Sequence, residues 1–161
     1  MEIELVECER AAQPILDRLL QLYQYDFSEI EGGVVNDAGR YDYAHVDEYW
    51  TEPGCHPFLV KVGAELAGFV LVKEASYLGQ AATRVIDEFF VMRKYRRRGV
   101  GREVARRVFD RLRGRWEMRE TPHNVAAQAF WRTVVGEYTG GRFEEIVKDG
   151  RPIQAFDNSL R

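Results

Sequence analysis

The chain contains 161 residues, of which 45% are hydrophobic and 30% are charged, and its formal net charge is −3. A chain of this length buries roughly 70% of its unfolded surface and is too short for two independent cores, so we expect one domain over residues 1–161. No run of 18 apolar residues occurs, and the first ten residues, MEIELVECER, are acidic. We therefore expect no membrane span, no membrane partner and no secretory signal, and a cytoplasmic location.

The N-terminal segment predicts a strand followed by a helix. Residues 2–6, EIELV, alternate as a half-buried strand does. A helix is predicted over residues 12–27, because apolar residues recur there at helical spacing. Its apolar stripe, which we expect to be core, consists of Leu16, Leu19, Leu20, Tyr23 and Phe27.

Residues 28–57 are marked by glycines and read as irregular, with a short helix expected over residues 43–50. The acidic residues in and just before this segment outnumber its single base, Arg40. The negative electrostatic field of these acids can concentrate a cationic amine. A solvated, variable loop explains the same composition equally well. The acids are Asp26, Glu29, Glu31, Asp37, Asp42, Asp47, Glu48 and Glu52.

Three further strands are predicted before the middle of the chain. Residues 58–61 and 69–73 form two of them, joined by a tight turn near Gly63 and Ala64. The third begins at Val85 and passes through the apolar residues 89–92. These segments predict an antiparallel meander at the centre of the fold.

A glycine turn and an amphipathic helix follow this third strand. The turn reads Arg96-Arg97-Arg98-Gly99-Val100-Gly101. A helix start has amides without partners and a partial positive charge, so glycines at this point favour the close approach of a phosphate group. The expected core-facing residues of the helix are Val100, Val104, Ala105, Val108, Phe109 and Leu112, and the solvent-facing residues are Arg102, Glu103, Arg106, Arg107, Asp110 and Arg113.

The spacing of the glycines excludes two common phosphate-binding motifs. A P-loop needs a Lys-Ser/Thr pair that this turn lacks. A dinucleotide fold needs a third glycine, where the chain has Val104. The turn instead matches Arg/Gln-x-x-Gly-x-Gly, with Arg96, Gly99 and Gly101 at the defined positions.

The C-terminal part predicts a strand, a helix and a hairpin. Residues 115–120, RWEMRE, read as a strand after a turn at Gly114. A helix then opens with the pattern Asn124-x-x-Ala127-x-x-Phe130-Trp131. The pair Asp149-Gly150, between apolar residues 143–147 and 153–156, predicts a β-hairpin, because both residues accept a positive φ.

The two motifs together resemble the GNAT superfamily of N-acetyltransferases. In that superfamily a glycine turn binds the pyrophosphate of acetyl-CoA, and an Asn-x-x-Ala-x-x-Phe-Tyr pattern follows at a similar distance. The resemblance covers roughly residues 58–148. It implies an α+β fold of three layers, with a mostly antiparallel central sheet of about six or seven strands and about four helices on its two faces.

The resemblance also implies a reaction, the transfer of an acetyl group from acetyl-CoA to a primary amine of a small molecule or an amino-acid-like acceptor. A V-shaped gap is expected between residues 89–91 and 116–119, where backbone groups of Phe89 and Val91 pair with the pantetheine arm and polarise the thioester oxygen. The residues assigned to the coenzyme are Phe89, Phe90, Val91, Arg96, Arg97, Arg98, Gly99, Val100, Gly101, Arg102, Asn124 and Phe130.

A base must take the proton of the amine, and Asp87 and Glu88 are the two candidates. They are adjacent on the predicted strand and should face opposite sides, so that only one meets the cleft unless a bulge intervenes. Family members place the base at either position, and both candidates stay open. Each residue could instead form a salt bridge to the arginine-rich helix.

The chain departs from the family at Trp131, where a tyrosine usually protonates the leaving thiolate. An indole N–H cannot deliver a proton. Tyr138, Tyr95 or solvent are the alternatives, and the Phe-Trp pair resembles a bacterial subgroup of predicted acetyltransferases. Asn124 is expected to cap its helix, to reach the coenzyme, or both. Because of Trp131, a regulatory module that binds acyl-CoA without turnover is the second interpretation.

The remaining features bear on partners. Residues 93–115 contain eleven basic and two acidic residues, a local charge of +9. This block raises nucleic acid as a third interpretation, but it lies on one loop and one helix with only Tyr95 as an interleaved aromatic residue, so we expect no nucleic acid. The two cysteines and three histidines lack the spacing of a metal site, and none is predicted. Many relatives dimerise, and a homodimer stays open.

Overall fold

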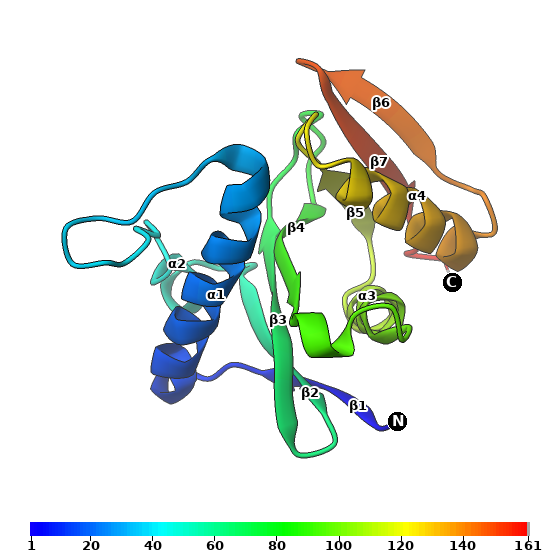
Figure 1. Ribbon diagram of the computed structural model, residues 1–161. Coiled ribbons are helices and arrows are strands. Elements are labelled where there is room, and N and C mark those ends of the chain that lie inside the picture. Colours follow the sequence, from blue (N-terminus) through cyan, green and yellow to red (C-terminus); the bar gives the residue numbers. More distant parts are fainter. Residues whose placement is uncertain (161) are drawn as a thin grey trace.

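The alternating segments assemble into one seven-stranded sheet in the computed structural model, which describes residues 1–160 (Figure 1). The strands lie in the order β1-β2-β3-β4-β5-β7-β6, and all neighbours are antiparallel except the parallel pair β4 and β5. Their bounds are β1 Ile3–Glu7, β2 His56–Val62, β3 Glu65–Glu74, β4 Thr83–Val91, β5 Arg115–Arg119, β6 Glu144–Lys148 and β7 Arg151–Asp157.

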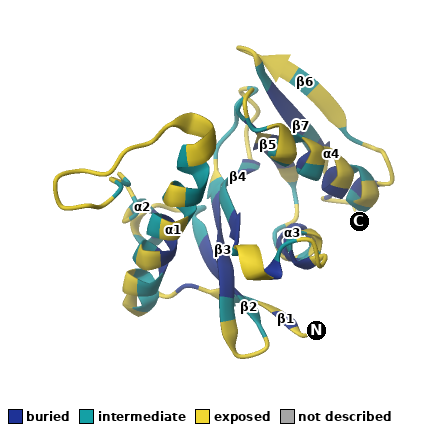
Figure 2. Cartoon of the chain, in the orientation of Figure 1, coloured by how far each residue is buried: buried dark blue, intermediate teal, exposed yellow. Residues whose placement is uncertain are grey.

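Helices cover both faces of the sheet, and each face has its own core. The bounds are α1 Gln13–Glu31, α2 Glu48–Thr51, α3 Val100–Arg111 and α4 Val125–Thr139, with short 3-10 turns η1 Arg10–Ala12 and η2 Arg93–Tyr95. Helices α1 and α2 pack on one face and α3 and α4 on the other, and each turns its buried stripe towards the strands (Figures 1 and 2). The predicted mixed, mostly antiparallel architecture is therefore confirmed. None of the helices described for residues 1–160 combines the length and the hydrophobicity that a membrane span requires.

Some predicted boundaries differ from the structure. Helix α1 runs four residues beyond the predicted end and stops where Gly32 takes a left-handed conformation, with φ of 72°. The short helix predicted over residues 43–50 is present only in part, because residues 44–47 form turns and α2 begins at Glu48. The hairpin is confirmed, with φ of 52° at Asp149 and 73° at Gly150.

Strand β3 extends further than predicted because it runs through Gly68. A side-chain carbon at this position would lie 1.9 Å from the carbonyl oxygen of Phe90. Glycine therefore lets β3 approach β4 closely where Gly68 pairs with Val91. The predicted strand began only after this glycine, at residue 69, whereas Gly68 is a point of close backbone contact within β3.

The sheet divides between β4 and β5, as the resemblance implies. These strands pair over three rungs only, from Thr83 opposite Arg115 to Val85 opposite Glu117. Beyond that point β4 pairs only with β3, and β5 pairs only with β7. The backbone edge of residues 86–91 that faces β5 therefore has no strand partner in the described chain.

Candidate active site

A β-bulge in β4 places Asp87 and Glu88 on the same side of the sheet. Glu88 pairs with Leu71, but the next rung joins Val72 to Ile86, so Asp87 is an extra residue on its strand. Both carboxylates consequently turn towards α1 and α2, while Ile86 packs in the opposite core. The sequence predicted opposite sides unless a bulge intervened, and the structure contains that bulge.

Asp87 is held by two partners. Its Oδ1 lies 3.0 Å from Nζ of Lys73, and its Oδ2 accepts a hydrogen bond from the hydroxyl group of Tyr49 on α2. Both oxygens are thus occupied. The geometry suits a fixed negative charge better than a base that must accept a proton.

Glu88 has a different environment. Its Oε1 accepts a hydrogen bond from the Tyr43 hydroxyl at 3.3 Å, and the nearby Tyr23 hydroxyl also favours its charged form. Burial raises the pKa of Glu88 to about 7 and the charge of Asp87 adds to the rise, although the two tyrosines oppose it. A carboxylate with a pKa near neutrality is well matched to general-base catalysis.

Both carboxylates line a cavity of about 340 Å³, which we call the carboxylate cavity. It lies where β4 and β5 diverge, and it also contacts α1 through Tyr23 and Phe27. Its volume falls within the range of small-molecule sites. A larger hollow of about 630 Å³ lies along β5, β6 and β7, but neither candidate base lines it. Two of its charged residues, Arg115 and Asp157, pair with each other at 3.8 Å.

The glycine turn forms the other half of the site. Gly99 is left-handed, with φ of 79°, and helix α3 begins immediately after it. The amide of Glu103 is the first to bond within the helix, to the carbonyl oxygen of Gly99 at 3.0 Å. The preceding amides, from Val100 to Arg102, have no acceptor in their own helix, which is the arrangement that binds phosphate groups.

A second cavity, of about 380 Å³, adjoins this turn, and we call it the loop-side cavity. Gly101 lines it, and a side-chain carbon at this position would lie 3.2 Å from the ring of Phe130 and 3.6 Å from that of Phe89. The absence of a side chain therefore keeps the approach to the turn open. The residues that line both cavities are Tyr23, Phe27, Phe89, Asn124, Ala127 and Trp131, so the cavities meet.

Most of the basic block around this turn is neutralised within the protein. Arg96, which was assigned to the coenzyme, donates to the carbonyl oxygen of Val91 at 2.6 Å and pairs with Asp26 of α1. Arg102 pairs with Glu137 at 3.1 Å. The block members with an acidic partner are Arg93, Lys94, Arg96, Arg102, Arg106, Arg107, Arg111, Arg113 and Arg115.

Arg97 and Arg98 are the exceptions. Across residues 1–160 neither has an ion pair or a side-chain hydrogen bond. They directly precede Gly99, and Arg97 lines the loop-side cavity. The free positive charge of the block is thus concentrated beside the glycine turn.

The other predicted coenzyme residues take several positions. Phe89 and Phe130 line the loop-side cavity, and their ring centroids lie 5.6 Å apart. Phe90 and Val100 are buried in the two cores. Asn124 caps α4 by accepting a hydrogen bond from the amide of Ala127 at 3.0 Å, and it lines both cavities.

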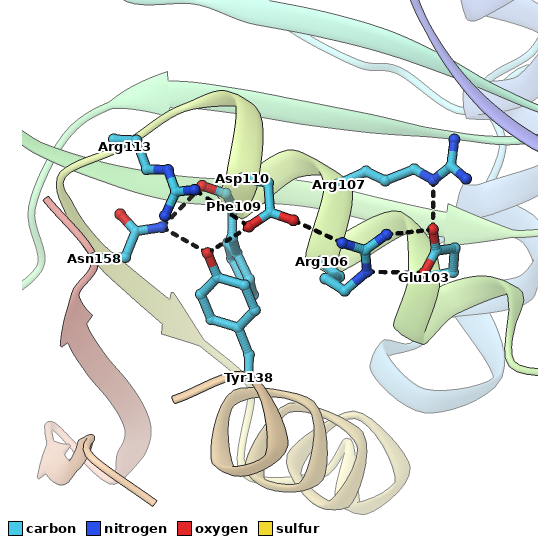
Figure 3. Close-up of polar contacts among 8 residues, drawn as sticks. All are labelled: Glu103, Arg106, Arg107, Phe109, Asp110, Arg113, Tyr138 and Asn158. Atoms are coloured by element: carbon cyan, nitrogen blue, oxygen red, sulfur yellow. Dashed lines mark hydrogen bonds and ion pairs between the residues drawn. The ribbon is translucent and has the colours of Figure 1, made fainter. Parts of the chain in front are cut away.

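The two tyrosines considered as proton donors lie away from both cavities. The Tyr138 hydroxyl donates to Asp110 at 3.0 Å and accepts from Asn158 at 3.0 Å at the C-terminal end of α3 (Figure 3). The Tyr95 hydroxyl bonds Glu65. Trp131 is 7% exposed and packs edge-on against Phe89. Geometry therefore rules against Tyr138 and Tyr95 as donors to a thiolate at this site.

The acidic segment does not form the expected field at the site. Asp26 pairs with Arg93 and Arg96, and Asp47 pairs with Arg10. None of the acids in residues 29–52 lines the carboxylate cavity. Its negative charge comes instead from the bulge in β4.

Sequence reasoning missed several residues of the site, among them Tyr23 and Glu120. Tyr23 was assigned to the apolar stripe of its helix, yet it is the one residue with a hydroxyl group among those that line both cavities. Glu120, at the end of β5, is 4% exposed, and neither carboxyl oxygen accepts a hydrogen bond. Burial raises the pKa of Glu120 to about 8, so it carries little charge at neutral pH. Its alternation with Trp116 and Met118 was the available signal.

The sheet divides between β4 and β5, and a glycine turn opens the helix that follows β4. Together with the sequence family that the chain matches, these features indicate an acyltransferase. A sequence model described as the acetyltransferase (GNAT) family matches residues 16–136. The chain belongs to this family. No curated protein sequence matches it.

Solved structures share this fold at low sequence identity. An acetyltransferase from Thermus thermophilus is 18% identical, with a TM-score of 0.70 over 98% of this chain and 97% of that one. The ribosomal-protein-S18-alanine N-acetyltransferase from Escherichia coli is 16% identical, with a TM-score of 0.62 over 99% and 96%. The spermidine N-acetyltransferase from Vibrio cholerae, in complex with CoA and spermine, is 14% identical, with a TM-score of 0.62 over 98% and 96%.

Proposed function

We propose that the protein transfers an acetyl group from acetyl-CoA to the primary amine of a small or amino-acid-like acceptor. The observation that carries the proposal is the meeting of two cavities. One opens on free helix amides beside unpaired arginines, and the other holds a carboxylate with a pKa of about 7. Solved relatives of the same fold include a complex with CoA and an amine.

In this proposal the loop-side cavity would receive the diphosphate and pantetheine arm of the coenzyme. The amides of Val100, Gly101 and Arg102 would hold the diphosphate, and Arg97 and Arg98 would supply opposite charge. The unpaired edge of β4 at Phe89 and Val91 would bind the pantetheine amides. When bound, acetyl-CoA supplies an acetyl group activated as a thioester.

Glu88 acts as the base in this proposal, and Tyr23 connects it to the leaving sulfur. As the amine nitrogen bonds to the acetyl carbon, Glu88 accepts an N–H proton. As the carbon–sulfur bond breaks and its electron pair stays on sulfur, Tyr23 donates its hydroxyl proton to sulfur and receives the proton from Glu88. The products are an amide and a free thiol, and Glu88 is again a carboxylate. This relay removes the need for a tyrosine at Trp131.

The change Tyr23→Phe is expected to lower kcat by about 100-fold, because it removes the hydroxyl that links Glu88 to the sulfur. Tyr43→Phe is the matched control, since it removes the other hydroxyl on Glu88 and Tyr43 lines neither cavity. Both changes raise the pKa of Glu88, so kcat is compared above that pKa, near pH 9. Equal losses in the two variants would contradict the relay.

Two measurements test the activity itself. Acetyl-CoA at about 100 times its Kd should stabilise the fold by about 2.7 kcal/mol, which corresponds to a rise in Tm of roughly 5–10 °C. Release of free thiol across a panel of amines should then identify turnover. Absence of a thermal shift rejects the coenzyme, and the activity with it.

The second candidate is a module that binds acyl-CoA without turnover. Trp131 favours it, because the residue at this position is buried and cannot donate a proton to sulfur. A thermal shift without thiol release on any amine would support this candidate. Thiol release that depends on Glu88 would reject it.

A further inference from the structure

The carboxylate cavity has walls of opposite charge. Asp87 and Glu88 project from β4, whereas Arg119 and Arg151 approach from the ends of β5 and β7. Arg119 is opposite Ile153 in the β5–β7 ladder, and Arg151 lies two residues from Ile153 on the same strand. Both arginines therefore belong to one face of the sheet, across the gap from the carboxylates.

Neither arginine has an acidic partner among residues 1–160, in contrast to most of the basic block. The guanidinium of Arg119 stacks 3.9 Å above the ring of Tyr77, which also lines the cavity. Nε of Arg151 donates to the backbone oxygen of Glu120 at 3.4 Å. A stacked guanidinium keeps its N–H edge available for a planar anion.

The nearby Glu120 does not cancel this charge. Because its carboxyl is buried with a pKa of about 8, it is mostly protonated at neutral pH. The cavity therefore presents two uncompensated cations on one wall and two acidic groups on the other. An acceptor with cationic groups alone would meet repulsion at the arginine wall.

We propose that the acceptor carries a carboxylate as well as the amine, and that Arg119 and Arg151 bind this carboxylate. The inference rests on the proposed function and deepens it. The amine lies at Glu88 and the carboxylate lies across the cavity, where the paired guanidinium forks provide bidentate hydrogen bonds. Free amino acids have this chemistry, and the cavity volume suits molecules of that size.

The test compares each amino acid with the amine that its decarboxylation gives: lysine with cadaverine, phenylalanine with phenethylamine, and alanine with ethylamine. For the preferred side chain, wild-type kcat/KM should favour the amino acid by about 10-fold or more. In the double variant Arg119→Gln/Arg151→Gln this ratio should fall by about 10–100-fold, mainly through KM of the amino acid. Differences in amine basicity cancel when the same pair is compared between variants.

Arg18→Gln is the matched control, because Arg18 is an exposed residue of α1 that lines neither cavity. It removes the same kind of charge and should leave the ratio as in the wild type. A thermal shift with CoA shows that each variant is folded. The inference is overturned if the wild-type protein acetylates decarboxylated amines as efficiently as amino acids, or if the ratio is unchanged in the double variant. Either result leaves the proposed function standing. Wild-type protein with neither CoA binding nor thiol release rejects the proposed function and the inference with it.

Discussion

Glu88→Gln is expected to lower kcat/KM by about 10²–10³-fold near pH 8. Glutamine keeps the size of the side chain and its contact with Tyr43 but cannot accept a proton from the amine. Coenzyme binding should persist, because Glu88 does not line the loop-side cavity. Initial rates of thiol release and the CoA-induced thermal shift together check this expectation.

The pH profile gives the same prediction a second readout. Glu88 must be ionised to act as a base, so wild-type activity should fall as the pH drops through about 7, the pKa of this residue. Asp87 contributes to that raised pKa, so Asp87→Asn should move the acid limb to lower pH. Comparison on one acceptor removes the contribution of the amine.

Glu120→Gln is the matched control for Glu88→Gln. Glu120 is a buried glutamate at the same cavity that is already mostly protonated at neutral pH, and glutamine resembles that state. The Glu120→Gln variant should lose less than about 10-fold in kcat/KM. If Glu88→Gln costs no more than Glu120→Gln, Glu88 is not the base.

Gly101→Val is expected to weaken CoA binding by about 100-fold or more, or about 2.7 kcal/mol. The first added carbon already meets the ring of Phe130 at 3.2 Å, and the two further methyl groups must enter the loop-side cavity or displace that ring. Either outcome blocks access to the helix amides. Isothermal titration with CoA measures the change.

Gly136→Ala provides the control for this glycine. Gly136 also lies within a helix, and the added carbon would meet Phe143 at an ordinary 3.6 Å. The substitution should stabilise the fold by about 0.5–1 kcal/mol and leave the affinity for CoA as in the wild type. Similar affinities for Gly101→Val and wild-type protein would remove the basis for the proposed diphosphate site.

The order of elements could be predicted because its signals are local. The glycine turn, the amphipathic α3 and the Asp149-Gly150 hairpin each follow from a few adjacent residues, and all three are present in the structure. The orientation of Asp87 and Glu88 could not be predicted in the same way. It depends on the register between β3 and β4, which no pattern within β4 alone reveals.

The sequence also could not show which charged side chains pair with one another. The eleven basic residues of the block look equivalent in the sequence, but acids far away along the chain, such as Asp26 for Arg96 and Glu7 for Arg111, neutralise most of them. Similarly, the spacing of Tyr23 correctly predicts a core-facing position but does not show that two cavities meet there. Long-range contacts thus decide which residues are available to a ligand.

The ion pairs of the basic block determine how strongly it attracts an anion over a long distance. Nine of its eleven cations pair with seven carboxylates, so the cluster and its partners keep a net charge of +4, and the two cations without a partner are Arg97 and Arg98 beside the glycine turn. Added salt should therefore slow the association of the coenzyme as expected for about four charges rather than eleven. The same arrangement limits nonspecific attraction of polyanions, although the sequence of this segment is strongly cationic.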